Sequence, residues 1–118
     1  DRRMTPVDRV VEVEDGQEIT IATTTVTARY LPGHSAGHTG WQVQAEGRRI
    51  LFCGDAVREP ARRQRTNRTD FDPKAAEQSL LSLLDDPPDV LYPGHGPFCL
   101  QQTRQWIGAE LGKLLSNR

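Results

Sequence analysis

Three histidines and one aspartate in this sequence stand in contexts that suit metal binding. His34 and His38 lie in the glycine-rich stretch LPGHSAGHTGW, His95 lies in LYPGHGPF, and Asp55 follows ILFCG. The chain has no other histidine, and Pro-Gly-His occurs twice. Two imidazoles and a carboxylate are a ligand set for a first-row metal, most often zinc. A single Pro-Gly-His is often an ordinary turn, but two of them together with Gly-Asp favour a metal site.

Each of these stretches follows a run of residues typical of a β-strand. The pattern of apolar and β-branched residues predicts strands, in chain order, at VVEVE (10–14), EITIA (18–22), TVTARYL (25–31), WQVQAE (41–46) and RRILFC (48–53). The last two predict a hairpin around Glu46-Gly47. Loops at strand ends commonly gather binding groups, so His34, Asp55 and His95 could converge at one edge of a sheet.

The second half of the chain has a helical period. Asp72 is a predicted N-cap with Pro73 at the first helical position, and DDPPD ends that helix. A short strand, DVLY, follows, and a second amphipathic helix is predicted over residues 101–115. The apolar positions are Ala76, Leu80, Leu83 and Leu84 in the first helix, and Trp106, Ile107, Leu111, Leu114 and Leu115 in the second.

The prolines and glycines beside the candidate ligands predict tight turns. Proline before each Gly-His fixes the backbone angle at which the chain enters the turn. We expect Gly33 and Gly94 to adopt conformations that a side chain would forbid, which would aim the following imidazole. Gly54 would let the chain turn sharply before Asp55.

Composition narrows the class of protein. The chain has 118 residues, of which 36% are hydrophobic and 26% charged, which suits one globular domain. No apolar run approaches the roughly 20 residues that span a bilayer, and the first residues do not resemble a secretory signal, so we expect a cytoplasmic protein without a membrane partner. Cys53 and Cys99 are too few for a disulfide framework and are expected to be core thiols. The net charge of -1 favours neither nucleic acid nor an acidic membrane.

The three glycine-rich stretches also resemble a known family. LPGHSAGHTGW, ILFCGDA and LYPGHGPF, in that order, are similar to the third, fourth and fifth metal-binding motifs of the metallo-β-lactamase fold superfamily, which includes glyoxalase II-type thioesterases, lactonases and zinc-dependent nucleases. The resemblance implies that His34 binds one metal ion, that His95 binds a second, and that Asp55 bridges both as the catalytic centre. His38 matches a position that is not normally a ligand, and is expected to support the ligands from behind.

The resemblance covers the chain only from about Val10 onward and omits one motif. Members of the family carry an N-terminal His-x-His-x-Asp-His, and no such motif occurs in these 118 residues. We therefore expect residues 1–118 to form the C-terminal half of the domain: an α/β fold with α+β layering, half of an αββα sandwich, in which a mostly antiparallel sheet carries helices on one face. The other face would be apolar and uncovered. Its expected residues are Val11, Val13, Ile19, Ile21, Val26, Val43, Ile50 and Phe52.

The function that the resemblance implies is metal-dependent hydrolysis of a thioester, lactone or similar small-molecule ester through a metal-bound hydroxide. The cofactor would be zinc, two ions in the complete domain, although iron and manganese suit the same donors. This chain alone is expected to be inactive, with the missing half supplied by a longer chain or a second polypeptide. A non-catalytic module that pairs through its open face, including as a self-dimer, is the alternative.

A nuclease of the same superfamily is a further alternative, prompted by the arginine-rich REPARRQRTNR. Arg62, Arg63 and Arg65 are weak candidates for binding an anionic substrate, and a solvated polar loop is the favoured explanation. The net charge of -1 argues against a nucleic-acid partner.

Overall fold

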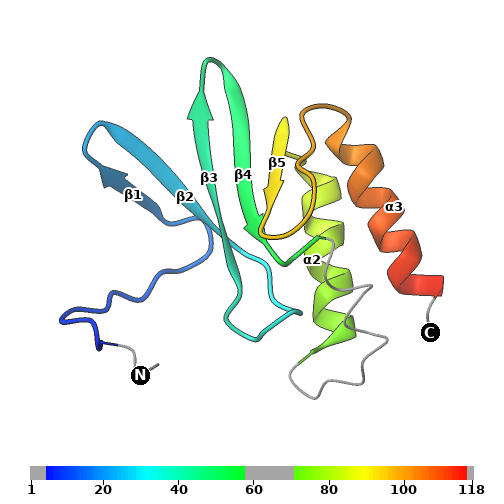
Figure 1. Cartoon of the computed structure of the whole chain (residues 1–118), viewed down its shortest axis with the longest axis horizontal. Coiled ribbons are helices and arrows are strands. Elements are labelled where there is room, and N and C mark those ends of the chain that lie inside the picture. The colour runs from blue at the N-terminus through cyan, green and yellow to red at the C-terminus, as the bar shows by residue number, and fades with distance from the viewer. Residues whose placement is uncertain (1–4, 58–70, 117–118) are drawn as a thin grey trace.

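The computed structural model describes residues 5–57 and 71–116 of the chain. Five strands and two helices follow one another along this part of the sequence (Figure 1). They are β1 (Glu18–Ile21), β2 (Thr24–Tyr30), β3 (Thr39–Ala45), β4 (Arg48–Gly54), α2 (Pro73–Asp85), β5 (Val90–Pro93) and α3 (Thr103–Ser116). The expected α+β layering is confirmed: the chain forms one mixed sheet, and both helices lie at the β5 side of it, with β1 at the far edge (Figure 1).

The direction of the strands determines which loops meet. The sheet has the order β1-β2-β3-β4-β5, with antiparallel pairing from β1 to β4 and parallel pairing of β5 with β4. Strands β2, β4 and β5 therefore all point the same way. Their carboxyl ends lie along one edge of the sheet, and the loops that follow them carry the candidate metal ligands.

Local sequence explains the turns and the start of α2. Glu46 and Gly47 connect β3 to β4 with φ angles of 55° and 76°, the left-handed pair that a two-residue hairpin turn requires. The Asp72 carboxylate accepts hydrogen bonds from the backbone N–H groups of Lys74 and Ala75, both at 3.1 Å, and so caps the first turn of α2. Pro73 follows at the first helical position, where its missing N–H costs nothing.

The core lies between the helices and one face of β4 and β5. It consists chiefly of Leu31, Leu51, Cys53, Val57 and Leu91 from the sheet and its loops, Ala76, Leu80 and Leu83 from α2, and Ile107 and Leu114 from α3. The predicted apolar faces of both helices thus supply core residues, although Leu84, Trp106 and Leu111 are only partly buried and Leu115 is 39% exposed. The threonine hydroxyl at position 103 is buried at the start of α3 and donates to the Pro88 carbonyl.

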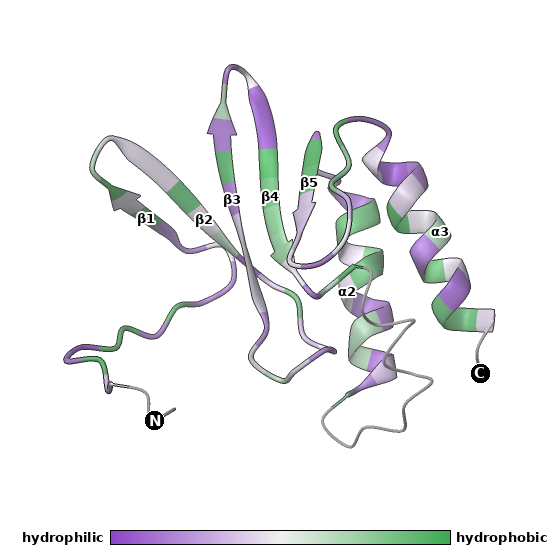
Figure 2. Ribbon diagram, viewed as in Figure 1, coloured by the Kyte–Doolittle hydropathy of each residue, from purple (hydrophilic) through white to green (hydrophobic). Residues whose placement is uncertain are grey.

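The opposite face of the sheet is apolar, and neither α2 nor α3 covers it. Directly paired residues share a face, and the pairs Val26↔Val43, Val43↔Ile50 and Ile50↔Val90 run across four strands on this side. The pairs Trp41↔Phe52 and Phe52↔Tyr92 extend it, and Ile19 adds β1. We call this surface the open face. Figure 2 shows hydrophobic segments in β1, β2, β4 and β5.

One predicted strand is absent. Residues 10–14, VVEVE, alternate like a strand but form none, and Val10 and Val11 are 76% and 62% exposed. The alternating residues match the two-residue period of a strand, but a strand also needs a neighbour to which it can form hydrogen bonds. Among the described residues, the antiparallel part of the sheet ends at β1. Val11 and Val13 therefore do not belong to the open face, whereas the other six residues expected there do.

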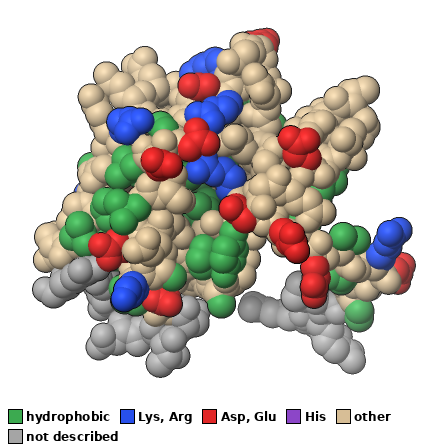
Figure 3. Space-filling view, turned by 180° about the vertical axis from the view of Figure 1, so that it is seen from behind, with side chains coloured by type: hydrophobic (Ala, Val, Ile, Leu, Met, Phe, Trp, Pro, Cys, Tyr) green, Lys and Arg blue, Asp and Glu red, His purple; other side chains and the backbone are tan. Residues whose placement is uncertain are grey.

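On the helix-bearing side, the region away from the helices is polar. A cavity of about 340 Å³ lies there, and the residues of this face that line it are Glu18, Thr25, Thr27, Gln42, Gln44 and Arg49. Seen from behind, the molecule carries acidic and basic side chains interleaved in a band (Figure 3).

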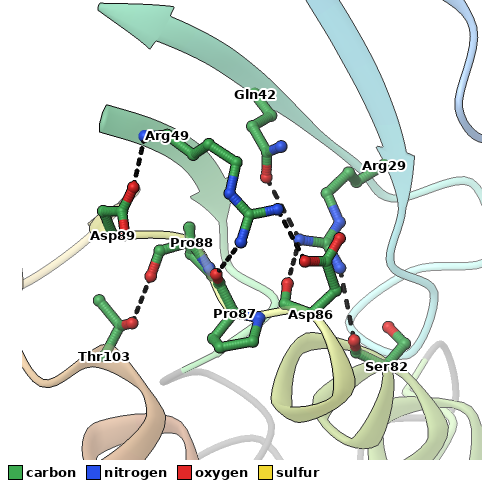
Figure 4. A network of polar contacts seen from close by, with 9 residues as sticks. All are labelled: Arg29, Gln42, Arg49, Ser82, Asp86, Pro87, Pro88, Asp89 and Thr103. Atoms are coloured by element: carbon green, nitrogen blue, oxygen red, sulfur yellow. Dashed lines mark hydrogen bonds and ion pairs between the residues drawn. The ribbon is translucent and has the colours of Figure 1, made fainter. Parts of the chain in front are cut away.

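Two arginines join the sheet to the end of α2 (Figure 4). Arg29 donates to the Asp86 carbonyl at 3.0 Å and to the Gln42 side chain at 3.3 Å. Arg49 forms an ion pair with the Asp86 carboxylate at 2.7 Å and donates to the Pro87 carbonyl. The guanidinium groups thereby satisfy carbonyls that the end of the helix leaves without partners.

Candidate metal centre

The loops after β2, β4 and β5 place three of the predicted ligands in contact. His34 Nε2 lies 3.2 Å from Asp55 Oδ2, and His95 Nδ1 lies 2.7 Å from Asp55 Oδ1. The His34 and Asp55 side chains are 20% and 21% exposed, whereas His95 is 68% exposed. Asp55 therefore presents one oxygen to each imidazole, at a site that solvent can reach.

Helix α2 holds the loop that carries His34. Gly33 has a φ of 140°, and a Cβ there would lie 2.5 Å from the Ala76 Cα. The Asp72 N–H donates to the Gly33 carbonyl at 2.9 Å, and the Ser79 hydroxyl donates to the Pro32 carbonyl at 2.7 Å. Only glycine fits at position 33, because both the backbone conformation and the space against α2 exclude a side chain.

His38 supports the turn that carries Asp55. The Asp55 N–H donates to His38 Nε2 at 2.9 Å. Gly54 has a φ of 54°, and a Cβ there would lie 2.7 Å from the Cε1 atom of His38. Burial lowers the pKa of His38, and the neighbouring His34 lowers it further, while Asp55 acts in the opposite direction.

Gly94 fits closely against Asp55, and its backbone conformation differs from the one predicted from the sequence. Its φ does not lie in the left-handed region, so the expectation of a forbidden conformation is wrong at this position. A Cβ on Gly94 would lie 3.2 Å from Asp55 Oδ1, and the Gly94 N–H donates to the Gly54 carbonyl at 2.8 Å. Glycine at position 94 therefore lets the β5 loop approach the carboxylate.

The donors fit zinc in type but not in number. The two imidazoles meet different oxygens of one carboxylate, and no group of three or more His, Cys, Asp or Glu side chains within residues 5–57 and 71–116 is arranged to hold an ion. His34 Nδ1 is buried without a hydrogen-bond partner, although a metal-binding histidine usually donates its second N–H to a supporting group. Because zinc takes four ligands, or three and water, the described residues alone supply an incomplete site.

The other residues singled out in the sequence do not join the site. Arg62, Arg63 and Arg65 lie outside the described residues. Cys53 is fully buried, and burial raises the pKa of its thiol to about 12, which suits a core residue and not a ligand or nucleophile. Cys99 is partly buried and its thiol contacts the Gln101 carbonyl.

Two supporting contacts were not predicted from the sequence. Ala76 was expected only as a core residue of α2, whereas its backbone also sets the position of the His34 loop. The bond from the Asp55 N–H to His38 joins residues 17 positions apart. The sequence signal for this contact is Gly54, because glycine permits both a positive φ and the close approach of another group.

Comparison with known proteins agrees with this fold. The sequence model described as the metallo-beta-lactamase superfamily matches residues 2–95, so the chain belongs to that superfamily. No curated protein matches the chain at the sequence level.

Solved structures of the superfamily align with nearly all of the chain. A metallo-beta-lactamase family protein from Thermus thermophilus has a TM-score of 0.72 at 22% identity, over 94% of this chain and 37% of its own. A superfamily protein from Sulfolobus tokodaii has a TM-score of 0.68 at 22% identity, over 94% and 41%. The subclass B3 enzyme BJP-1 of Bradyrhizobium japonicum has a TM-score of 0.63 at 19% identity, over 96% and 49%. The chain thus spans half or less of the length of these structures.

Proposed function

We propose that this chain is the C-terminal half of a metal-dependent hydrolase that cleaves a thioester, lactone or similar ester when its domain is complete. The observation that carries the proposal is the position of Asp55, which lies between His34 and His95 with one carboxylate oxygen facing each imidazole. A carboxylate placed between two imidazoles could serve as a shared donor to two ions. Two metal ions would supply polarisation of the substrate carbonyl and activation of water.

In the complete domain, His34 would hold one ion and His95 the other, and Asp55 would contribute to both. Each ion then has two donors from this chain and needs more from outside it. Zinc suits the donors, as iron and manganese do. The chain alone is therefore expected to be inactive.

The missing donors and the open face point to the same partner. The open face exposes Ile21 by 63% and Phe52 by 47%, and Phe52 stacks on Tyr92 with ring centroids 5.4 Å apart. An apolar sheet face of this kind is normally buried against another layer. The other half of the domain, in a longer chain or a second polypeptide, would cover this face and complete both metal sites.

The cellular setting is proposed to be cytoplasmic. Both cysteines are free, and a reducing compartment keeps them so. No helix in the described part of the chain is long and apolar enough to cross a membrane.

A non-catalytic pairing module is the second candidate, and the open face favours it. A self-dimer would bury the open faces of two copies against each other, with His34, Asp55 and His95 contributed twice. A nuclease is disfavoured by the net charge of -1 and by the interleaved charges in Figure 3.

Native mass spectrometry of the purified protein tests the proposal, because it reads subunit masses and bound metal together. A complex of this chain with a second polypeptide and two metal ions supports the hydrolase, and thioesters and lactones would be the first substrates to assay. The variant D55N should then lose metal while the two polypeptides stay associated. A bare chain without metal would agree with the inactivity expected of this half alone. A complex with a second polypeptide that binds no metal and is inactive on both substrate classes, or a metal-free self-dimer, would contradict the proposal and favour the pairing module.

A further inference from the structure

His38 connects two of the loops that carry candidate metal ligands. Its backbone carbonyl accepts a hydrogen bond from the Leu31 N–H at 2.9 Å, which closes the loop that contains His34. Its side chain crosses to the end of β4, where Nε2 accepts the Asp55 N–H at 2.9 Å. The position of Asp55 relative to the His34 loop is therefore held through one residue.

The hydrogen bond determines the tautomer of the imidazole. A ring nitrogen that accepts an amide N–H carries no proton of its own, so in the neutral ring the proton is on Nδ1. The lone pair of Nε2 faces the Asp55 amide and is not free for a metal ion. His38 is thus excluded as a ligand on geometry, although it lies among the ligands.

The ring also fills the space beside the turn. A Cβ on Gly54 would come within 2.7 Å of Cε1 and 2.9 Å of Nε2, so glycine and imidazole occupy complementary positions. The His38 ring meets that of His34 edge to face, with centroids 5.8 Å apart. Gly54, the Asp55 backbone and the His34 ring therefore all contact one side chain.

We propose that His38 is a positioning residue, which in its Nδ1–H tautomer accepts the Asp55 amide and thereby fixes the Asp55 carboxylate between His34 and His95. The contact itself needs no metal. Its consequence for metal binding rests on the function proposed above.

NMR spectroscopy of the 118-residue chain tests the tautomer directly. Ring ¹⁵N shifts of His38 should show a protonated Nδ1 and an unprotonated Nε2. The opposite pattern, with the proton on Nε2, would overturn the proposal. This measurement uses the wild-type chain and does not depend on the folding of a variant.

A matched pair of variants separates the hydrogen bond from packing. In H38Q the side-chain oxygen can take the place of Nε2, whereas H38M has similar length and lacks a strong acceptor. A net hydrogen bond is worth about 1 kcal/mol, so amide exchange at Asp55 should be about fivefold faster in H38M and within about twofold of wild type in H38Q. Equal acceleration in both variants would show that only ring packing matters, and unchanged exchange in H38M would show that the bond does not hold the turn.

Metal uptake distinguishes this proposal from the proposed function. In the assembled domain, a Zn²⁺ titration followed by calorimetry should give weaker binding for H38M than for H38Q. If wild-type protein binds no Zn²⁺ while the Asp55 amide responds as expected, the hydrolase proposal fails and the positioning role stands. If Zn²⁺ binds equally in both variants, Asp55 does not need His38, and the positioning role fails.

Discussion

The two faces of the sheet differ, although the same strands build both. On the helix-bearing face, residues that the helices cover are apolar and residues that they leave uncovered are polar. Leu51 and Leu91 are fully buried beneath the helices, whereas Thr27 and Gln42 lie beyond the helices beside a polar cavity. The amino-acid sequence therefore distinguishes covered from uncovered positions within one face. The described helices and the solvent therefore account for the residue types on this face.

The open face does not follow that rule. The pairs Val26↔Val43 and Val43↔Ile50 lie at its centre, and Phe52 stacks on Tyr92, with no helix over any of them. If this face were meant for solvent, alternation should give polar residues here, as it does around the polar cavity on the other side. We propose that a layer outside the described residues covers the open face.

The neighbours Leu51 and Phe52 provide the sharpest test, because they point to opposite faces. Leu51 is 0% exposed and Phe52 is 47% exposed. We expect L51A to lower the free energy of unfolding by about 2–5 kcal/mol, through lost burial and a cavity. In the isolated chain F52A should cost only about 1 kcal/mol, since half of the ring is already in water.

Urea denaturation of both variants measures this difference. When the open face is covered by its partner, the cost of F52A should rise to the roughly 3–5 kcal/mol of a buried phenylalanine. Equal destabilisation by the two variants in a demonstrably monomeric chain would show that the open face is already packed in solution. The two faces of the sheet would then not differ in burial.

Gly33 gives the second prediction, which concerns the junction between the helix-bearing face and the candidate metal centre. G33A forces a Cβ against the Ala76 backbone at a φ of 140°, so it should cost about 3 kcal/mol and displace His34. Gly37 is the matched control: it lies in the same loop and a Cβ there meets nothing within 4 Å. G37A should change stability by less than about 0.5 kcal/mol. Thermal unfolding compares them, and similar melting temperatures for both variants would contradict the packing of the His34 loop on α2.

Short sequence patterns correctly predicted turns and helix caps, but they failed where a segment needed a neighbouring strand to pair with. The Glu46-Gly47 hairpin and the Asp72 cap are set by a few adjacent residues, and both are present. The alternating residues 10–14 meet every local condition for a strand, but no described strand pairs with them. Strand pairing is a non-local property, so periodicity alone could not exclude this segment.

For the candidate site, the positions of the residues after predicted strands indicated which loops would meet. They did not indicate which contacts hold those loops in place. His34, Asp55 and His95 follow strands that run in one direction, which is enough to bring them to one edge. Ala76 against Gly33, and His38 against Gly54, depend on how α2 and the loops pack in three dimensions. Gly94 is a similar case. The sequence alone does not distinguish a glycine that allows close packing from one that allows a positive φ.

The smallest effect is expected on the polar side, at the ion pair between Arg49 and Asp86. The hydrogen bond from Arg49 lowers the pKa of Asp86 below its usual 3.8. A carboxylate with a lowered folded pKa stabilises the fold above the unfolded pKa, and this contribution disappears as the pH falls through the folded value. Because the Asp86 side chain is 61% exposed and that of Arg49 is 35% exposed, D86N should cost only about 0.5 kcal/mol at pH 7, and less in about 1 M salt.

Urea denaturation of D86N, with D85N as the control for removing an adjacent charge, checks this prediction. The difference between D86N and wild type should be constant between pH 7 and pH 5 and should shrink below about pH 4. The Asp86 carbonyl still accepts from Arg29 in the variant, which keeps the end of α2 attached. A loss at pH 7 that persists at pH 3, or one equal to that of L51A, would mean that Asp86 acts through packing. The polar residues around Asp86 would then stabilise the fold through packing, as the helix-covered core does.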